Sequence, residues 1–417
     1  MNKWTIRCAV VVAALCAVPS VSRAEGDRVF CARWQYQYTD TAEGEDYLLH
    51  NMFFGLWGEI DASHSFAYVL RDGLIYWFGY LDESGCSPPL SGLSGTYEFG
   101  VYPVLASGSS EVWVYPDFNM DFRFFANTFF QLSVPDGATD VETRSVGLGD
   151  PVANVAAVST LMLTRPDNGH DGFFAIVYAD RDEQVGQANM GNDGAVIQLG
   201  VDGFGSKLAT RKSIIAHELG HAAMFESFGS GNVDYGDPIP PGVDPLCECG
   251  HVNVSAPFHC LQSKEFIGAA IAEGWAHFYA AHLFNNPSQS NASFAYYKEF
   301  LHRGIFFNWV EAPPIRVDVY DDPPWMANEC SGSHTGRGVE YDWLTYLYAV
   351  KHKTPNAYTF ADFQSVFLKA CGDSDCDPDL HFWTWNMLKE AANDAHGPGS
   401  PKAEHWEDLG GQHRVDF

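Results

Sequence analysis

The chain has few positively charged residues: 24 Lys and Arg stand against 53 Asp and Glu, so the formal net charge at pH 7 is -29 over 417 residues. A surface with this balance repels the phosphate backbone of nucleic acids and anionic lipid headgroups. We therefore expect no nucleic-acid partner. Charged residues make up only 18% of the sequence and hydrophobic residues 46%, which excludes wholesale disorder and predicts a folded globular protein.

The sequence also lacks an apolar run long enough to cross a bilayer, which takes about 20 residues. A shorter run, residues 8–18, follows Lys3 and Arg7 and precedes a small-residue segment at 22–24. This order of basic, apolar and small residues is typical of a cleavable secretory signal. We expect residues 1–24 to be a signal peptide and the mature protein to be secreted, extracellular or periplasmic, without a membrane anchor.

Several catalytic signatures are absent. The sequence has no Gly-x-Ser-x-Gly elbow, no Walker loop and no Gly-x-Gly-x-x-Gly fingerprint. It also contains no internal repeat and no low-complexity tract. Serine-hydrolase and nucleotide-binding functions therefore have no support in this sequence.

Cysteine is present in an even number after the expected signal is removed, since 2 of the 10 cysteines lie within it. An even count in an exported chain favours disulfides. Sequence alone does not fix the pairing, and we favour Cys31 with Cys86 and Cys371 with Cys376. A cluster of Cys and His at residues 247–260 could instead bind a structural zinc, but an oxidising compartment favours disulfides there too.

The hydrophobic pattern divides the chain in two. Up to about residue 125, apolar residues alternate with polar ones in short runs separated by Gly, Pro, Asp and Ser, which is typical of strands. We expect an N-terminal antiparallel β-sandwich over residues 25–149. Its role is left open among a propeptide, a substrate-recruiting module and a permanent structural partner.

The second part, residues 150–417, has a different pattern. A strand is predicted at 195–200, and helical spacing follows at 206–228, 261–284 and 339–351. A small sheet followed by helices makes this part, and the chain as a whole, α+β.

A metal-ligand motif, His217-Glu218-Leu219-Gly220-His221, lies in the predicted helix at 206–228. Residues four apart share one face of a helix, so two imidazoles can converge on one zinc ion with the glutamate beside them. The alternative is a solvated helix face with two ordinary histidines. The flanking residues are apolar, however, whereas a solvated face is rich in Lys and Glu.

Zinc in a catalytic site needs a third protein ligand and an open fourth position. Glu273 is the best candidate, because a carboxylate among Ala, Ile, Trp and Phe is costly to bury unless it is paired or bound to metal. His277, one turn further along, could orient a ligand or replace Glu273 as ligand. Alternatively, Glu273 could have a structural role and form an ion pair with Lys264 or Arg303 instead of binding metal.

These residues resemble the gluzincin metallopeptidases, the thermolysin-like branch with a His-Glu-x-x-His helix and a glutamate on a following helix. The resemblance rests on His217, Glu218, His221 and Glu273 and covers roughly residues 150–390. It implies a gluzincin-like domain in which a strand before the zinc helix, here 195–200, holds an extended substrate at the sheet edge. The sequence departs from the family at His277, where thermolysin-like members have an Asp.

The resemblance further implies that His217, His221 and Glu273 bind Zn²⁺ and that Glu218 is the general base toward a zinc-activated water. The expected substrate is a protein or peptide. A group that steadies the oxyanion is also required, and Tyr341 with His334 behind it is our candidate.

Two other functions remain open at this point. One is a secreted binding protein whose zinc site is structural or degenerate, and the other is a zinc hydrolase of a non-peptide amide. The position of Glu218 favours catalysis, because a structural zinc site needs no carboxylate there.

Overall fold

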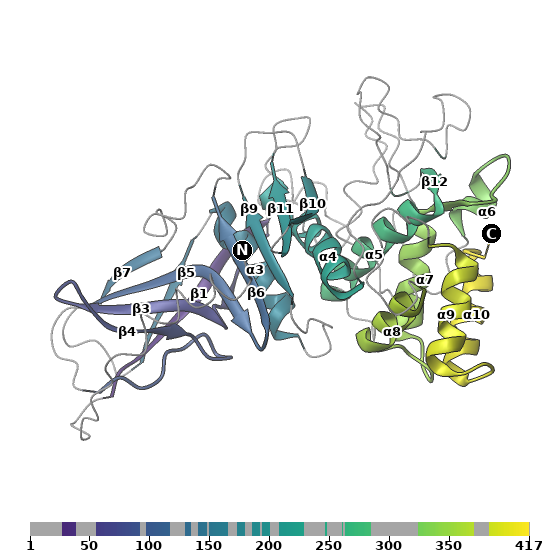
Figure 1. Cartoon of the computed structure of the whole chain (residues 1–417). Coiled ribbons are helices and arrows are strands. Elements are labelled where there is room, and N and C mark those ends of the chain that lie inside the picture. Colours follow the sequence, from purple (N-terminus) through teal and green to yellow (C-terminus); the bar gives the residue numbers. More distant parts are fainter. Residues whose placement is uncertain are drawn as a thin grey trace, which may run out of the picture.

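Strands form one half of the molecule and helices the other, as Figure 1 shows. This computed structural model describes residues 27–38, 56–91, 97–116, 130–134, 141–147, 150–165, 173–179, 186–191, 194–200, 208–228, 247, 261, 263–284, 324–370 and 383–416. The expected signal peptide, the Cys371–Cys376 pair and most of the 247–260 cluster lie outside these residues. The α+β class expected from the sequence is confirmed.

The larger sheet has eight strands in the order β10-β11-β9-β6-β5-β3-β4, with β7 pairing with β5. Its strands are β3 (Ser65–Arg71), β4 (Leu74–Tyr80), β5 (Tyr97–Ser107), β6 (Ser110–Tyr115), β7 (Phe130–Val134), β9 (Phe174–Tyr178), β10 (Gly186–Gly191) and β11 (Gly194–Leu199). A smaller sheet has the order β2-β1-β8 and consists of β1 (Val29–Tyr38), β2 (Leu56–Asp61) and β8 (Val141–Val146).

The expectation of an N-terminal, purely antiparallel sandwich is wrong for two strand pairs. β1 pairs in parallel with β8, and β6 pairs in parallel with β9. The β6–β9 pair joins strands from both sides of the boundary expected at 149/150, so the larger sheet continues across it. Alternating hydrophobicity identifies the buried face of each strand but not its partner or direction, which explains the error.

Helix α3 (Pro151–Thr164) links the two sheets. Its start follows a local rule: the Asp150 side chain accepts a hydrogen bond from the Val152 amide, and proline occupies the first turn. The buried side chain of Asn154 then accepts from the Gln37 amide of β1 and donates to the carbonyls of Gln37 and Ala209. These bonds attach the smaller sheet to the turn that precedes the next helix.

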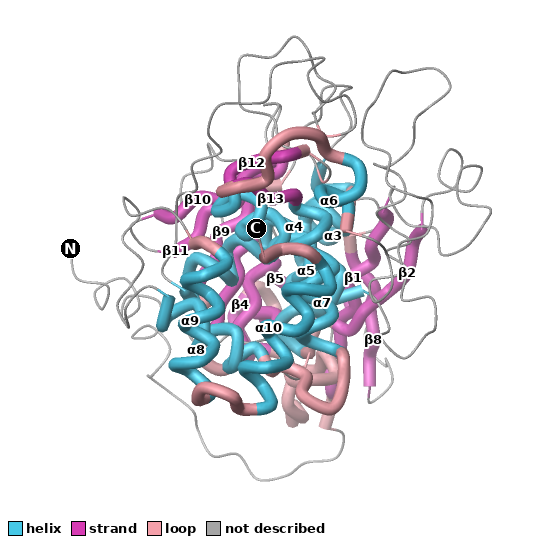
Figure 2. The backbone as a smooth tube through the Cα atoms, turned by 90° about the vertical axis from the view of Figure 1, so that its right-hand side faces the viewer, coloured by secondary structure: helices cyan, strands magenta, loops and turns pink. Residues whose placement is uncertain are grey.

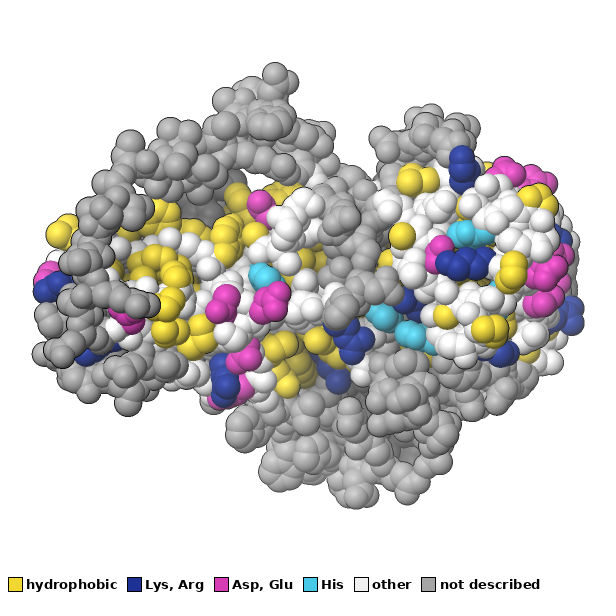
Figure 3. Space-filling view, turned by 90° about the horizontal axis from the view of Figure 1, so that it is seen from below, with side chains coloured by type: hydrophobic (Ala, Val, Ile, Leu, Met, Phe, Trp, Pro, Cys, Tyr) yellow, Lys and Arg dark blue, Asp and Glu magenta, His cyan; other side chains and the backbone are white. Residues whose placement is uncertain are grey.

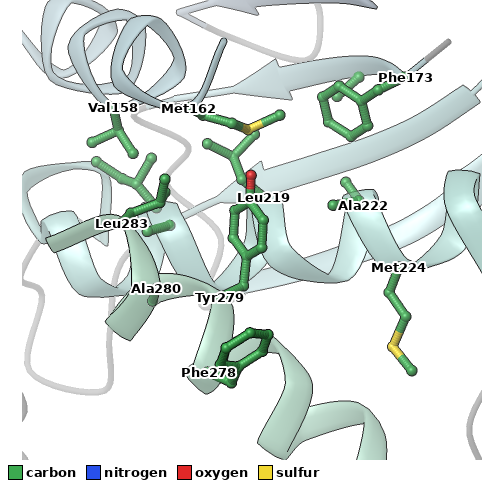
Figure 4. Close-up of a cluster of buried hydrophobic side chains, with 14 of the residues drawn as sticks. Val158, Met162, Phe173, Leu219, Ala222, Met224, Phe278, Tyr279, Ala280 and Leu283 are labelled. Carbon is green, nitrogen blue, oxygen red and sulfur yellow. The ribbon is translucent and has the colours of Figure 1, made fainter. Parts of the chain in front are cut away.

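Helices α4 (Lys212–Phe228) and α5 (Ile267–Phe284) form the centre of the core. Helix α5 is buried on nearly every side, which suits its run of Ala, Ile, Phe and Trp. Figure 4 shows Met162 of α3, Leu219 of α4 and Tyr279 of α5 in this buried cluster. The predicted helix at 261–284 begins late, because residues Lys264–Phe266 form strand β12.

Strand β12 pairs with β13 (Arg337–Val339), and this ribbon holds the starts of α5 and α7 (Glu340–His352). Helices α6 (Trp325–Glu329), α8 (Phe360–Ala370), α9 (Trp385–His396) and α10 (Pro401–His413) complete the helical half. Figure 2 shows α7 to α10 beside one another, with strands of the larger sheet behind them. The buried rings of Trp343, Tyr346 and Trp406 pack edge to face between them, with interplanar angles of 85° and 84°.

Two disulfides are formed among the described cysteines. Cys31–Cys86, one of the favoured pairings, is confirmed. Cys247–Cys330 was not among the pairings favoured from the sequence, and it attaches the residue after α6 to the segment beside β12.

The surface is apolar on part of the strand half, as Figure 3 shows. Strand β4 exposes five large apolar side chains: Leu74, Ile75, Tyr76, Phe78 and Tyr80. Within the described residues, no helix combines the length and hydropathy required of a membrane span.

Candidate metal centre

Helix α4 places two histidines on one face, as the spacing predicts. The Nε2 atoms of His217 and His221 lie 3.1 Å apart, and their ring planes are close to perpendicular at 88°. Both side chains are buried, with 7% of each residue exposed. The apolar residues around the motif account for this burial, because they turn this face of α4 toward the core.

Helix α5 supplies the third group. The Oε2 atom of Glu273 lies 3.0 Å from His217 Nε2 and 3.1 Å from His221 Nε2, and only 1% of Glu273 is exposed. The three atoms therefore form a nearly equilateral triangle. The structure brings together His217, His221 and Glu273, although 52 residues separate the second histidine from the glutamate.

Two glycines allow this convergence. A Cβ atom at Gly220, between the two histidines, would lie 3.0 Å from the Ala276 Cα atom of α5. A Cβ atom at Gly274, next to the glutamate, would lie 2.4 Å from the Trp343 Cβ atom of α7. Because glycine has no Cβ atom, α5 packs closely on α4 and on α7 at the level of the site.

The triangle suits a cation better than hydrogen bonds alone. Two imidazole nitrogens and a carboxylate oxygen at mutual distances of 3.0–3.1 Å cannot all be joined by protons, because each Nε2 carries at most one. Ligands bound at about 2.0–2.1 Å to a tetrahedral zinc lie about 3.3 Å apart, close to these separations. The buried group could therefore hold a metal ion.

The protonation of His217 fits the same conclusion. Burial, followed by the neighbouring His277 imidazole, lowers the pKa of His217 to about 3. The ring is therefore neutral across the physiological pH range, and the neutral imidazole is the form that binds a metal.

A further pair of residues extends from the triad toward α7. His277 Nδ1 lies 3.2 Å from His217 Nδ1, and His277 Nε2 lies 3.0 Å from Glu340 Oε2. His277 thus faces the ring nitrogen of His217 that is turned away from Glu273. This position suits a residue that orients His217 and does not suit the replacement of Glu273 as ligand.

Sequence reasoning missed Glu340. An acidic residue in the first turn of a helix is usually solvated and complements the helix dipole. Here it is only 1% exposed. Only its packing against α5 reveals the contact with His277.

The remaining candidates are Glu218 on α4, Tyr341 on α7 and His334 before β13. Glu218 is 6% exposed and follows His217 on α4. Tyr341 is 2% exposed, and its ring packs against Trp325. His334 lies with Nε2 3.3 Å from the carbonyl oxygen of Cys330, so neither oxyanion candidate gains support from these contacts.

The edge strand also differs from the expectation. The predicted strand at 195–200 is β11, but it lies between β9 and β10, so β10 (Gly186–Gly191) is the edge among the strands that the structure describes. β10 pairs antiparallel with β11 and contacts α4. The sequence did not predict this strand, because its segment, Gly-Gln-Ala-Asn-Met-Gly, lacks the β-branched and aromatic residues typical of strands.

No protein-family profile matches the chain, and no curated protein has a significant sequence match to it. The sequence motif and the geometry of the triad are therefore the features that bear on function.

Proposed function

We propose that this protein is a secreted zinc metallopeptidase. The observation that carries the proposal is the buried triangle of His217, His221 and Glu273, with Glu218 next to the first histidine. Two imidazoles and one carboxylate are the ligand set of thermolysin-like catalytic zinc sites, which keep a fourth position open. The resemblance to the gluzincins agrees with this set.

In the proposed reaction, His217, His221 and Glu273 would hold the zinc, which would supply a bound water of lowered pKa and polarise the scissile carbonyl. Glu218 takes a proton from the attacking water on its carboxylate and later donates it to the leaving amine. The apolar residues around the motif restrict water around this carboxylate and so strengthen its electrostatic interactions.

A peptide substrate would bind in extended conformation along β10. As the edge strand of the larger sheet, β10 is where another strand can add through backbone hydrogen bonds. It also contacts α4, the helix that carries the motif. In this proposal β10, and not the strand predicted at 195–200, is the edge strand that holds the substrate.

We also propose that the protein is exported from the cytoplasm. The disulfides Cys31–Cys86 and Cys247–Cys330 are compatible with an oxidising compartment. They support the secretory interpretation of residues 1–24.

The test is hydrolysis of casein and of a peptide library by the purified protein, with metal content measured by mass spectrometry. We expect activity that is lost on chelation and restored by Zn²⁺. Glu218→Gln should retain zinc but lose about 10²–10⁴-fold in kcat, the range for a general base. Glu273→Gln should lose the metal itself.

Other results would redirect the assignment. Bound zinc without hydrolysis of any peptide would favour the binding protein with a structural site. Hydrolysis of small amides alone would favour the non-peptide amidase. Full activity in Glu218→Gln would refute the role of this residue.

A further inference from the structure

The contact between His217 and His277 restricts where the protons of both rings can lie. If His217 binds a metal through Nε2, its proton must be on Nδ1, which faces His277 Nδ1 at 3.2 Å. His277 Nδ1 must then accept the hydrogen bond from His217 Nδ1–H. The proton of the neutral His277 ring must therefore be on Nε2. That nitrogen lies 3.0 Å from Glu340 Oε2, a carboxylate oxygen that can accept it.

We propose that Glu340 and His277 form a positioning relay that holds His217 in the tautomer required for metal binding. The inference rests on the proposed metal site. In this relay, the Glu340 carboxylate accepts from His277 Nε2–H, and His277 Nδ1 accepts from His217 Nδ1–H. The lone pair of His217 Nε2 is thereby directed at the triangle with His221 and Glu273.

The surroundings keep the relay in one arrangement. Glu340 is 1% exposed, and the side chain of His277 is 15% exposed, so water competes little for these hydrogen bonds. The close contact of Gly274 with α7 fixes the distance between the helices that carry the two residues. Metal-bound histidines are commonly oriented directly by a carboxylate or carbonyl, whereas here an additional imidazole lies between.

The relay predicts a specific order among substitutions at residue 277. His277→Phe keeps the ring but removes the acceptor, and we expect zinc to bind about 10–100-fold more weakly, the range for partners that orient metal ligands. His277→Asn places Oδ1 where His277 Nδ1 lies, so it can still accept from His217. We expect His277→Asn to recover most of the affinity.

Substitutions at Glu340 test the far end of the relay. Glu340→Leu removes the acceptor and should weaken zinc binding, whereas Glu340→Gln retains an acceptor oxygen and should have a smaller effect. Asp342→Asn is the matched control. Asp342 is a buried carboxylate on the same helix as Glu340, but it accepts hydrogen bonds from backbone amides of α6. This substitution should leave the affinity for zinc unchanged.

The experiment measures the Kd for Zn²⁺ by competition with a chromophoric chelator, on folded protein verified by circular dichroism. Weak binding by His277→Phe and Glu340→Leu, with recovery in His277→Asn, supports the relay. Equal weakening of zinc binding in His277→Phe and His277→Asn indicates a packing role only and overturns the relay. Zinc binding within twofold of the wild type in both His277→Phe and Glu340→Leu also overturns it. Failure of the wild type to bind zinc overturns the relay and the metal centre together.

This readout is separate from peptide hydrolysis. If the wild type binds zinc with the expected order among variants but hydrolyses no peptide, the relay stands and the proposed activity fails. If it hydrolyses peptides and the variants bind zinc equally, the activity stands and the relay fails.

Discussion

Gly220→Ala tests whether close packing of α4 on α5 builds the metal centre. The added Cβ atom would lie 2.9 Å from Tyr279 Cβ, 3.0 Å from Ala276 Cα and 3.1 Å from the Ala276 carbonyl oxygen. Ordinary contacts of a Cβ atom begin at 3.4 Å, so the helices must separate by a few tenths of an ångström. Two of the three contacts are with backbone, which cannot turn aside as a flexible side chain can.

The expected magnitude is a balance of two effects. Overpacking of a buried site costs about 1–3 kcal/mol. Replacing glycine by alanine within a helix recovers up to about 1 kcal/mol. We therefore expect Gly220→Ala to lower the free energy of unfolding by about 1 kcal/mol, and to weaken zinc binding because the Glu273 carboxylate moves away from both imidazoles.

Gly411→Ala provides the matched control. Gly411 lies in α10, is exposed, and has no atom within 4 Å of the position of its added Cβ. Only the helix propensity acts there, so this variant should be more stable than the wild type by about 0.5–1 kcal/mol.

The assay is urea unfolding of both variants and the wild type in the presence of a chelator, so that metal binding does not contribute to stability. Zinc affinity is then measured separately. If Gly220→Ala unfolds at the same urea concentration as Gly411→Ala, or above it, the helices accommodate the methyl group and the argument from close packing is refuted.

Two further predictions concern stability. Burial raises the pKa of the Asp342 carboxyl to about 7 despite hydrogen bonds from the Met326 and Trp325 amides. The folded protein thus keeps a proton that the unfolded chain releases near its ordinary value of 3.8, so this group's contribution to stability falls as pH rises from about 4 to about 7. Asp342→Asn should remove that dependence, as measured by urea unfolding at several pH values, and parallel curves for variant and wild type would contradict it. Replacing Cys31 and Cys86 together by serine should lower the free energy of unfolding by about 4 kcal/mol, the loop-entropy value for a separation of 55 residues. An unchanged melting temperature would show that this disulfide does not restrict the unfolded chain.

The sequence was most informative where the chemistry is local. The spacing of His217 and His221 places both on one helical face whatever the rest of the fold, and an isolated carboxylate in the apolar segment around Glu273 indicates a buried partner. Strand and helix patterns were sufficient to predict the α+β class. They also placed β11 and the C-terminal ends of α4 and α5, at residues 228 and 284, but put the starts of both helices too early.

Strand partners and the limits of a sheet depend on contacts between distant segments, and here the sequence was insufficient. It assigned the edge to residues 195–200, whereas β10 covers that strand. It expected a separate antiparallel sandwich, whereas β6 and β9 pair in parallel across the expected boundary. Periodicity records which face of a strand is buried, and it carries no information about the neighbouring strand.

The amino-acid sequence by itself determined the candidate metal ligands, since their identity and spacing are properties of one helix and of one carboxylate in an apolar segment. Only the tertiary structure decided what lies behind them. The contact of His277 with the outer nitrogen of His217, and of Glu340 with His277, depends on how closely α5 approaches α4 and α7. Two glycines permit that approach, and its consequences extend over more than 60 residues of chain, beyond the reach of any local pattern.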